Sequence, residues 1–348
     1  KYAAEAGLFP PALRMSLIAL VGLVLFSAGG VLRRKWLGSA DDAVAKRPLA
    51  YAHLLQGAGI GVLYLTVFAA MRLYALLPMV WALSFLVAIA ALAAVIALLQ
   101  NTMSMAFIGF LGGFAAPILV SSGSGNYQAL FSYYLLLDVA IVAIAWLRAW
   151  RPLNLLGFVA TFGVMGWWVA RAYTPDMYAG AQPFVLGFFV LFVLAALFYA
   201  LRHGLPARRA VDASLLFGPP LAAMGIQLKL VQGMEYAGAF SALIASALYL
   251  ALAAWMQGRA QAAEDGSQAQ QGARWLGQRY WALGLLFLTL AVPLALDAQW
   301  TAAIWALEGA AVYHLGLRQG QWFARAMGLA LQPLAWLAFA EQSVGSGY

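Results

Sequence analysis

Apolar segments of about 20 residues, separated by short polar connections, recur along the whole chain. A helix of ~20 apolar residues spans the ~30 Å hydrocarbon core of a bilayer. Only 9% of the residues are charged, compared with roughly 25% in a typical soluble domain. Lipid offers the backbone no water to bond, so such segments must be helices that satisfy their own hydrogen bonds. The sequence therefore predicts an all-α, polytopic transmembrane helical bundle.

The length of the chain sets the number of spans. A chain of 348 residues holds about 12 spans of ~20 residues with short connections, which leaves no room for a sizeable soluble domain. We therefore predict a single transmembrane domain over residues 1–348. The predicted spans cover residues 11–32, 49–71, 77–100, 103–120, 127–147, 153–169, 183–201, 210–228, 236–256, 280–296, 299–317 and 322–339. Because the chain begins at Lys1 without a Met or a charged leader, we expect it to be a fragment of a longer membrane protein.

Lys and Arg fall almost entirely in every second connection between the predicted spans. Odd-numbered connections hold fourteen of these residues, and even-numbered ones hold only Arg72, Arg171 and Lys229. The fourteen are Arg33, Arg34, Lys35, Lys46, Arg47, Arg148, Arg151, Arg202, Arg208, Arg209, Arg259, Arg274, Arg279 and Arg318. Cytoplasmic loops carry the excess of Lys and Arg, so the odd connections, including a hydrophilic loop at 258–277, are predicted to be cytoplasmic. Residues 1 and 348 then lie on the periplasmic side of a bacterial inner membrane.

Composition excludes several classes of site. The chain has no Cys, which excludes disulfides, thiolate metal ligands and cysteine nucleophiles. His53, His203 and His314 are the three histidines, too few for a convincing metal site, and we expect neither a metal nor a cofactor. The net charge of +8 is expected from basic loops that face anionic lipid, and we expect no binding of nucleic acid. The expected partners are membrane lipids and another envelope protein.

Two carboxyl groups, Asp138 and Glu308, lie near the middle of predicted spans. A charge at the bilayer centre is costly unless it is paired, protonated or in contact with a water-filled cavity. One interpretation is a proton relay or a substrate-binding pair, and the alternative is two hydrogen-bonded acids that lock helices together. Gln56 is a further polar residue within a span, and we expect His53 and His314 to form hydrogen bonds at helix interfaces. These five residues are the candidate intramembrane polar site.

The segment Gly109–Asn126 is apolar but is broken by glycines and by Pro117, and it ends in a small polar loop. Gly109 and Gly113 have the spacing that lets helix backbones pack closely. The alternative is a broken helix whose loop N–H groups hold an anion. The loop has neither the Lys and Ser/Thr of a phosphate loop nor the glycine spacing of a hydrolase elbow. The candidate residues of this outer-face loop are Ser122, Ser124 and Asn126.

Five stretches of the chain carry a resemblance to a known family. They are KYAAEAGLFPPALR at 1–14, LQGAGIGVLYLTVFAA at 55–70, LGGFAAPILVSSGSGNYQALFSYYLLLD at 111–138, WRPLNLLGFVATFG at 150–163 and WTAAIWALEGAAVYHLGLRQ at 300–319. With these residues the chain resembles domain-of-unknown-function family 2339, a family of large multi-pass bacterial inner-membrane proteins. The resemblance implies the helical fold and the membrane location, and it implies no activity. Asp138 departs from it, because Asn is expected more often at this position.

Three hypotheses for function follow from these features. The first is a multi-pass inner-membrane protein of the cell envelope that transports or handles a lipid or a glycan. The alternative is a non-catalytic scaffold or anchoring subunit of an envelope complex. The third is a membrane-embedded transferase, for which Asp176, Glu235 and Asp297 are the acidic candidates at the outer face. No motif links these acids, so the sequence leaves enzymatic activity open and favours a non-enzymatic role.

Overall fold

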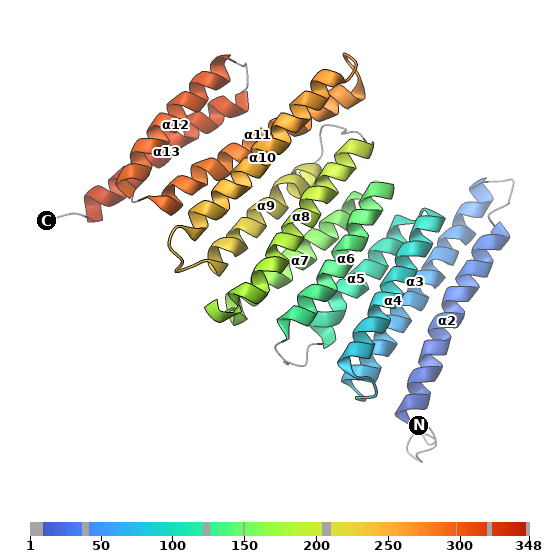
Figure 1. The fold of residues 1–348 in the computed structure, drawn as a ribbon. Helices are drawn as coiled ribbons and strands as arrows, with labels where there is room; N and C mark the ends of the chain where they lie inside the picture. Colours follow the sequence, from blue (N-terminus) through green and yellow to red (C-terminus); the bar gives the residue numbers. More distant parts are fainter. Residues whose placement is uncertain are drawn as a thin grey trace. The chain divides into compact units, whose positions relative to one another are not determined.

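The computed structural model describes residues 10–36, 42–120, 126–148, 150–203, 210–296, 298–318 and 322–345. Within these ranges the chain forms twelve α-helices and one short 3-10 helix, and it contains no strand (Figure 1). The elements are α2 Pro11–Trp36, α3 Asp42–Arg72, α4 Met79–Gln100, α5 Met103–Val120, α6 Tyr127–Leu147, α7 Arg151–Ala172, η1 Pro175–Met177, α8 Tyr178–His203, α9 Ala210–Leu230, α10 Ala237–Ala262, α11 Gln268–Ala295, α12 Ala298–Arg318 and α13 Trp322–Gly345. The all-α fold class predicted from the sequence is confirmed.

The α-helices follow the predicted spans in order along the chain. Eight of the described helices are long and apolar enough to cross a membrane by length and composition. Their apolar segments are Pro11–Trp36, Pro48–Arg72, Val80–Gln100, Tyr127–Leu147, Arg151–Ala172, Pro175–Phe198, Ala237–Ala262 and Ala269–Ala295. A shorter apolar segment, Met103–Pro117, lies in α5. The arrangement is that of a multi-pass membrane protein.

The hydrophilic segment 258–277 is helical over most of its length, whereas the sequence suggested a loop. Helix α10 continues to Ala262 and α11 begins at Gln268, so residues 263–267 connect them. Alanine and glutamine are frequent in this segment and have high helix propensity. Hydropathy does not detect a polar helix that continues beyond a membrane span, which explains the difference.

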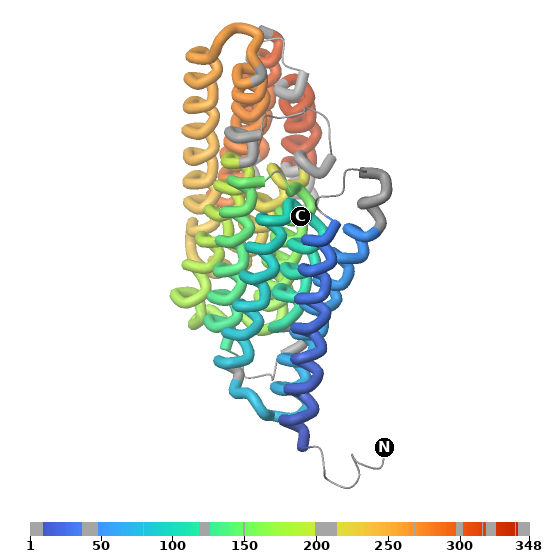
Figure 2. The backbone as a smooth tube through the Cα atoms, turned by 90° about the vertical axis from the view of Figure 1, so that its right-hand side faces the viewer, coloured from blue at the N-terminus to red at the C-terminus, as the bar shows by residue number. Residues whose placement is uncertain are grey.

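The chain divides into two compact units, and the single transmembrane domain inferred from the sequence stays a prediction. The first unit comprises Lys1–Trp168, Pro183–Phe198 and Ala210–Pro219, and the second comprises Val169–Gln182, Tyr199–Arg209 and Pro220–Tyr348. Each unit contains helices packed in pairs, with α2 on α3 in the first unit and α10 on α11 in the second. Figure 2 shows α10 and α11 as two adjacent helices joined at one end by a short turn.

Glycines permit the closest helix crossing in each of two pairs. Between α2 and α3 of the first unit, a Cβ atom at Gly59 would lie 2.6 Å from the carbonyl oxygen of Gly22. Between α12 and α13 of the second unit, a Cβ atom at Gly328 would lie 2.6 Å from the carbonyl oxygen of Gly309. Any larger residue at Gly59 or Gly328 must therefore separate the backbones. Small residues at helix crossings are how membrane helices pack without a hydrophobic driving force.

Three buried tyrosines of α3 and α6 donate hydrogen bonds to backbone carbonyl groups of α5. The pairs are Tyr64 with Gly109 at 2.8 Å, Tyr133 with Gly113 at 2.9 Å and Tyr134 with Phe114 at 2.7 Å. Pro117 lies inside α5 and has no N–H, which leaves the Gly113 carbonyl without its usual helical donor. Tyr133 supplies that donor. Helix α5 is therefore continuous from Met103 to Val120, in place of the broken helix that the sequence left as an alternative.

Helices α10 and α11 pack through aromatic rings and one interhelical hydrogen bond in the second unit. The rings of Tyr249 and Phe287 stack with their centroids 5.8 Å apart, and both side chains are fully buried. The hydroxyl of Ser246 donates to the carbonyl oxygen of Gly284 at 2.8 Å. These contacts hold the two helices in a fixed register.

Candidate functional site

Asp138 lies near the middle of α6 and is 1% exposed. The hydroxyl of Thr161 on α7 donates a hydrogen bond of 2.8 Å to its Oδ2 atom. The other carboxyl oxygen, Oδ1, is buried and has no hydrogen-bond partner among the residues that the structure describes. The sequence located this carboxyl group, and the structure adds that described residues bind one of its two oxygens.

The space beside the unpartnered oxygen is set by a glycine on α7. A Cβ atom at Gly157 would lie 3.3 Å from Oδ1 of Asp138 and 2.6 Å from Cδ1 of Ile141. The nearest aromatic ring is that of Phe192 on α8, whose Cζ atom would lie 3.4 Å from the same Cβ. The hydroxyl of Tyr134, one turn before Asp138, donates its proton to the Phe114 carbonyl of α5. The other two atoms nearest the Gly157 Cβ position, on Ile141 and Phe192, are carbon atoms.

An unpaired carboxylate in such surroundings is costly unless it carries a proton, has a partner or reaches water. Oδ2 already accepts from Thr161, and this bond is compatible with a proton on Oδ1. Oδ1 of Asp138 can therefore bind and release a proton, or accept a hydrogen bond from a ligand.

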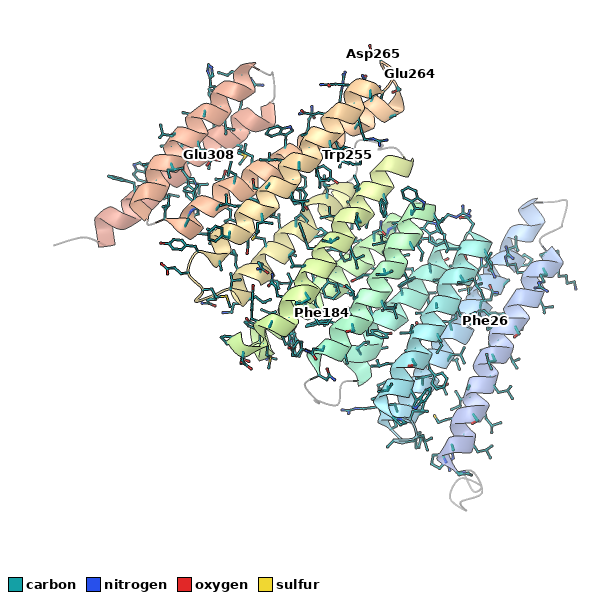
Figure 3. All side chains as sticks on the ribbon, viewed as in Figure 1. Phe26, Phe184, Trp255, Glu264, Asp265 and Glu308 are labelled. Carbon is teal, nitrogen blue, oxygen red and sulfur yellow. The ribbon has the colours of Figure 1, made fainter. Side chains whose placement is uncertain are left out.

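Glu308 lies near the middle of α12 (Figure 3). Its carboxyl group, like that of Asp138, accepts a hydrogen bond from one threonine. The hydroxyl of Thr289 on α11 donates to its Oε1 atom at 2.6 Å. Its Oε2 atom is buried and has no hydrogen-bond partner in the described part of the chain. The indole of Trp305 donates to the carbonyl oxygen of Thr289 at 3.2 Å, which holds α11 and α12 together at this level. Asp138 belongs to the first unit and Glu308 to the second.

His53 and Gln56 form a second polar pair in the first unit, one turn apart on α3. Gln56 is 2% exposed, and its Cγ atom would lie 2.7 Å from a Cβ atom at Gly29 of α2. Within the described ranges, Oε1 of Gln56 and Nε2 of His53 are buried without a hydrogen-bond partner. The interface hydrogen bond expected of His53 is therefore not made by its Nε2 atom with a described residue.

The remaining predicted site residues are His314 of the intramembrane set and the three residues of the outer-face loop. His314 is exposed on α12. Asn126 caps the N-terminus of α6, because its Oδ1 accepts from the amide of Ala129 at 3.0 Å, which is a common role for Asn. Ser122 and Ser124 lie outside the described residues. Across the ranges that are described, no group of three or more His, Cys, Asp or Glu residues could hold a metal ion.

The connection between α7 and α8 carries one of the acids considered for a transferase. Asp176 in η1 is exposed, as is Glu235 after α9, and Asp297 lies outside the described residues. The hydroxyl of Tyr173 donates to the carbonyl oxygen of Leu230 at 2.7 Å. Burial raises the pKa of Tyr173, with smaller contributions from Tyr178 and Asp176, so this hydroxyl remains a donor at neutral pH.

Sequence reasoning did not identify the two threonines that bind the carboxyl groups. Thr161 is 1% exposed and Thr289 is 7% exposed. A polar residue on the span next to an intramembrane acid is a signal that could have suggested both. Sequence separation alone does not give the level at which two helices pair, so the partner of each acid could not be chosen.

Comparison with known protein families identifies the family to which the chain belongs. The family described as "Predicted membrane protein (DUF2339)" matches residues 1–344. The chain belongs to this family. DUF2339 membership confirms the resemblance seen in the sequence, and together with the long apolar helices it makes the chain a multi-pass membrane protein. No curated protein and no solved structure matches this DUF2339 protein.

Proposed function

We propose that this protein transports or handles a lipid or a glycan in the bacterial inner membrane, with Asp138 as a proton-carrying group. The observation that carries the proposal is that one oxygen of its carboxyl group accepts a hydrogen bond and the other has no partner among the described residues. Thr161 binds Oδ2 at 2.8 Å, and Oδ1 has no partner among the described residues. An acid with a purely structural role is normally bound at both oxygens, because an unsatisfied buried polar atom is costly.

The position of Asp138 supports a role in coupling proton binding to the packing of α6 on α7. Its bond joins α6 to α7, and Gly157 on α7 leaves room for Oδ1. Gain or loss of a proton changes the hydrogen bond to Thr161, and so changes the relative stability of the packing between these two helices. Coupling of this kind is how intramembrane acids act in proton-driven transporters.

The aromatic surroundings support an amphipathic cargo. Phe158, Phe162 and Phe192 form a ring cluster beside Gly157, with centroids 5.6–6.2 Å apart. An apolar, aromatic environment with one acid suits a cargo that has an acyl or prenyl part and a polar head. The positive-inside distribution of Lys and Arg supports the inner membrane as the location, with residues 1 and 348 on the periplasmic side.

Proton movement in reconstituted vesicles tests the proposal. The full chain is incorporated in liposomes that contain a pH-sensitive dye, and internal pH is followed after a jump in external pH under a potassium diffusion potential. We expect the wild-type chain to move protons and Asp138→Asn to reduce this movement to the level of empty liposomes. Asp176→Asn, which changes an exposed acid outside the helical core, is the matched control and should behave as wild type. Equal proton movement in folded Asp138→Asn and wild-type protein would contradict the proposal.

A scaffold role is the second candidate, and the exposure of α2 supports it. Within the most apolar 18-residue stretch of α2, only 17% is buried, compared with 33–44% of the corresponding stretch in the other seven long apolar helices. Val21 and Val24, away from the glycines that contact α3, are 54% and 57% exposed. A photo-crosslinking residue at Val21 should give a discrete protein adduct in native membranes if this face holds a partner. A control position at Val139 on α6, which is 48% exposed, should give lipid adducts; lipid adducts at both positions would count against a scaffold.

A further inference from the structure

Helices α10 and α11 form a hairpin that is longer than a bilayer is thick. They contain 26 and 28 residues, which correspond to about 39 Å and 42 Å at 1.5 Å per residue. The hydrocarbon core is ~30 Å thick. Counted from the opposite ends of the two helices, a hydrocarbon core of this thickness leaves about 10 Å at the connected ends outside it.

The projecting end is fixed by one buried glutamine. Gln270 is 4% exposed, and its side-chain amide donates to the carbonyl of Ala260 at 3.2 Å and to Oδ1 of Asp265 at 2.9 Å. Its Oε1 accepts from the amide of Gly266 at 3.1 Å, and Ser267 caps α11 by accepting from the amide of Gln270 at 3.1 Å. The hairpin thus keeps its geometry outside the membrane, where Figure 3 shows Glu264 and Asp265 at its end.

On α10, a tryptophan and an arginine lie together on one flank of the hairpin. The guanidinium carbon of Arg259 lies 5.4 Å from the centroid of the Trp255 ring. These residues directly precede the buried residues Met256 and Ala260, and so lie about 100° to one side of the face that packs on α11. Trp255 is 43% exposed and lies about 27 Å from the opposite end of the helix.

Helix α11 has the same arrangement. The guanidinium carbon of Arg279 lies 4.1 Å from the centroid of the Trp275 ring, and its Nη1 donates to the Trp275 carbonyl at 3.3 Å. These residues directly precede the buried Leu276 and Tyr280. Trp275 lies about 30 Å from the opposite end of α11. Both tryptophans therefore lie at the depth of a membrane surface, where Trp is enriched. By the same count the backbone of Arg259 lies about 6 Å farther out than Trp255, and that of Arg279 about 6 Å farther in than Trp275.

The two pairs lie at the same level and on the same flank. A Cβ atom at Gly277 would lie 3.3 Å from Cβ of Met256, which sets residues 253–259 opposite residues 274–280. In an antiparallel pair, positions displaced in the same direction from the packed face lie on one flank. Arg274 lies opposite Arg259 but, about 140° around α11 from Arg279, it lies on the other flank. The carboxyl groups of Glu264 and Asp265 lie farther out, at the end of the hairpin.

We propose that Arg259 and Arg279, framed by Trp255 and Trp275, bind the phosphate headgroup of an anionic phospholipid. Each guanidinium carbon lies over an indole ring, and a guanidinium has five N–H groups in a planar fork that suits phosphate oxygens. Nη1 of Arg279 also donates to the Trp275 carbonyl and to Oε1 of Gln278 at 3.3 Å each. The exposed indole of Trp255 provides an apolar surface for the adjoining glycerol and acyl carbons. The inference rests on the membrane location of the chain and is independent of the role proposed for Asp138.

Native mass spectrometry of the full chain in detergent tests this site. The protein is titrated with phosphatidylglycerol, with phosphatidylcholine and with inorganic phosphate. The proteins compared are wild type, Arg259→Gln, Arg279→Gln, the double variant and Arg274→Gln. Arg274→Gln removes the same charge at the level of Arg259 but on the other flank, so it is the matched control.

We expect each single substitution at Arg259 or Arg279 to weaken phosphatidylglycerol binding about five-fold, and the double variant roughly 30-fold. Arg274→Gln should stay within about two-fold of wild type, and phosphatidylcholine binding should not change. Equal losses at all three arginines would reveal diffuse charge attraction and overturn the site. Inorganic phosphate binding as tightly as the lipid would also overturn it. If the double variant fails to fold, Arg259→Gln, which changes an exposed side chain, decides the question.

Discussion

The hydroxyl of Tyr133 donates a hydrogen bond of 2.9 Å to the carbonyl oxygen of Gly113, four residues before Pro117. This carbonyl is the one that a proline at position 117 deprives of its helical N–H. In a bilayer such a group must find a donor within the protein. A side chain of α6 therefore compensates for a proline of α5, and the two helices depend on each other.

Replacement of Tyr133 by Phe should destabilise the protein by about 1–3 kcal/mol, because the Gly113 carbonyl is then buried without a donor. Thermal unfolding in detergent measures the effect. Adding Pro117→Ala should recover most of the loss, because an alanine in place of the proline supplies the backbone N–H that the Gly113 carbonyl lacks.

Tyr134→Phe is the control for this rescue. Tyr134 bonds to the carbonyl of Phe114, which does not depend on Pro117. The stability lost in Tyr134→Phe should therefore not be recovered when Pro117→Ala is added. If Pro117→Ala rescues both variants equally, the specific link between Tyr133 and Pro117 is wrong.

The sequence predicted what depends on hydropathy and position, and missed what depends on pairing between helices. The depth of Asp138 follows from its place in an apolar segment, but its partner Thr161 follows from the register of α6 on α7. The close glycine of α3 was also missed. Gly57 and Gly61 have the spacing typical of packing, yet the structure brings Gly59 against α2 and leaves open space at Gly61. A spacing motif shows which residues share one face of a helix, but it does not show whether that face packs against another helix.

Thr161→Val should reduce proton movement in the liposome assay, because Asp138 then loses its one described hydrogen-bond donor. Thr161→Ser keeps a hydroxyl in place and should retain most of the movement. A double-mutant cycle of Asp138→Asn and Thr161→Val should give a coupling free energy of roughly 0.5–3 kcal/mol in unfolding experiments. A coupling near zero would show that the two side chains do not depend on each other.

Gly59→Ala should destabilise the α2–α3 pair far more than Gly61→Ala. A Cβ atom at Gly59 meets the backbone of α2 at 2.6 Å, whereas one at Gly61 has no neighbour within 4 Å. Both substitutions raise helix propensity by the same amount, so their difference isolates the crossing. Thermal unfolding of the two variants measures it, and equal unfolding temperatures would exclude a close crossing at Gly59.

The absence of Cys from the sequence allows a direct test of orientation. Single cysteines at Glu264, in the connection between α10 and α11, and at Asp176, between α7 and α8, mark opposite ends of the spans. The positive-inside distribution predicts Glu264 to be cytoplasmic and Asp176 to be periplasmic. A membrane-impermeant maleimide added to intact cells should therefore label Asp176→Cys and not Glu264→Cys, and permeabilised cells should show both. The reverse pattern would invert the proposed topology and place the Trp–Arg surface of α10 and α11 in the outer leaflet, where it would meet a different set of lipids.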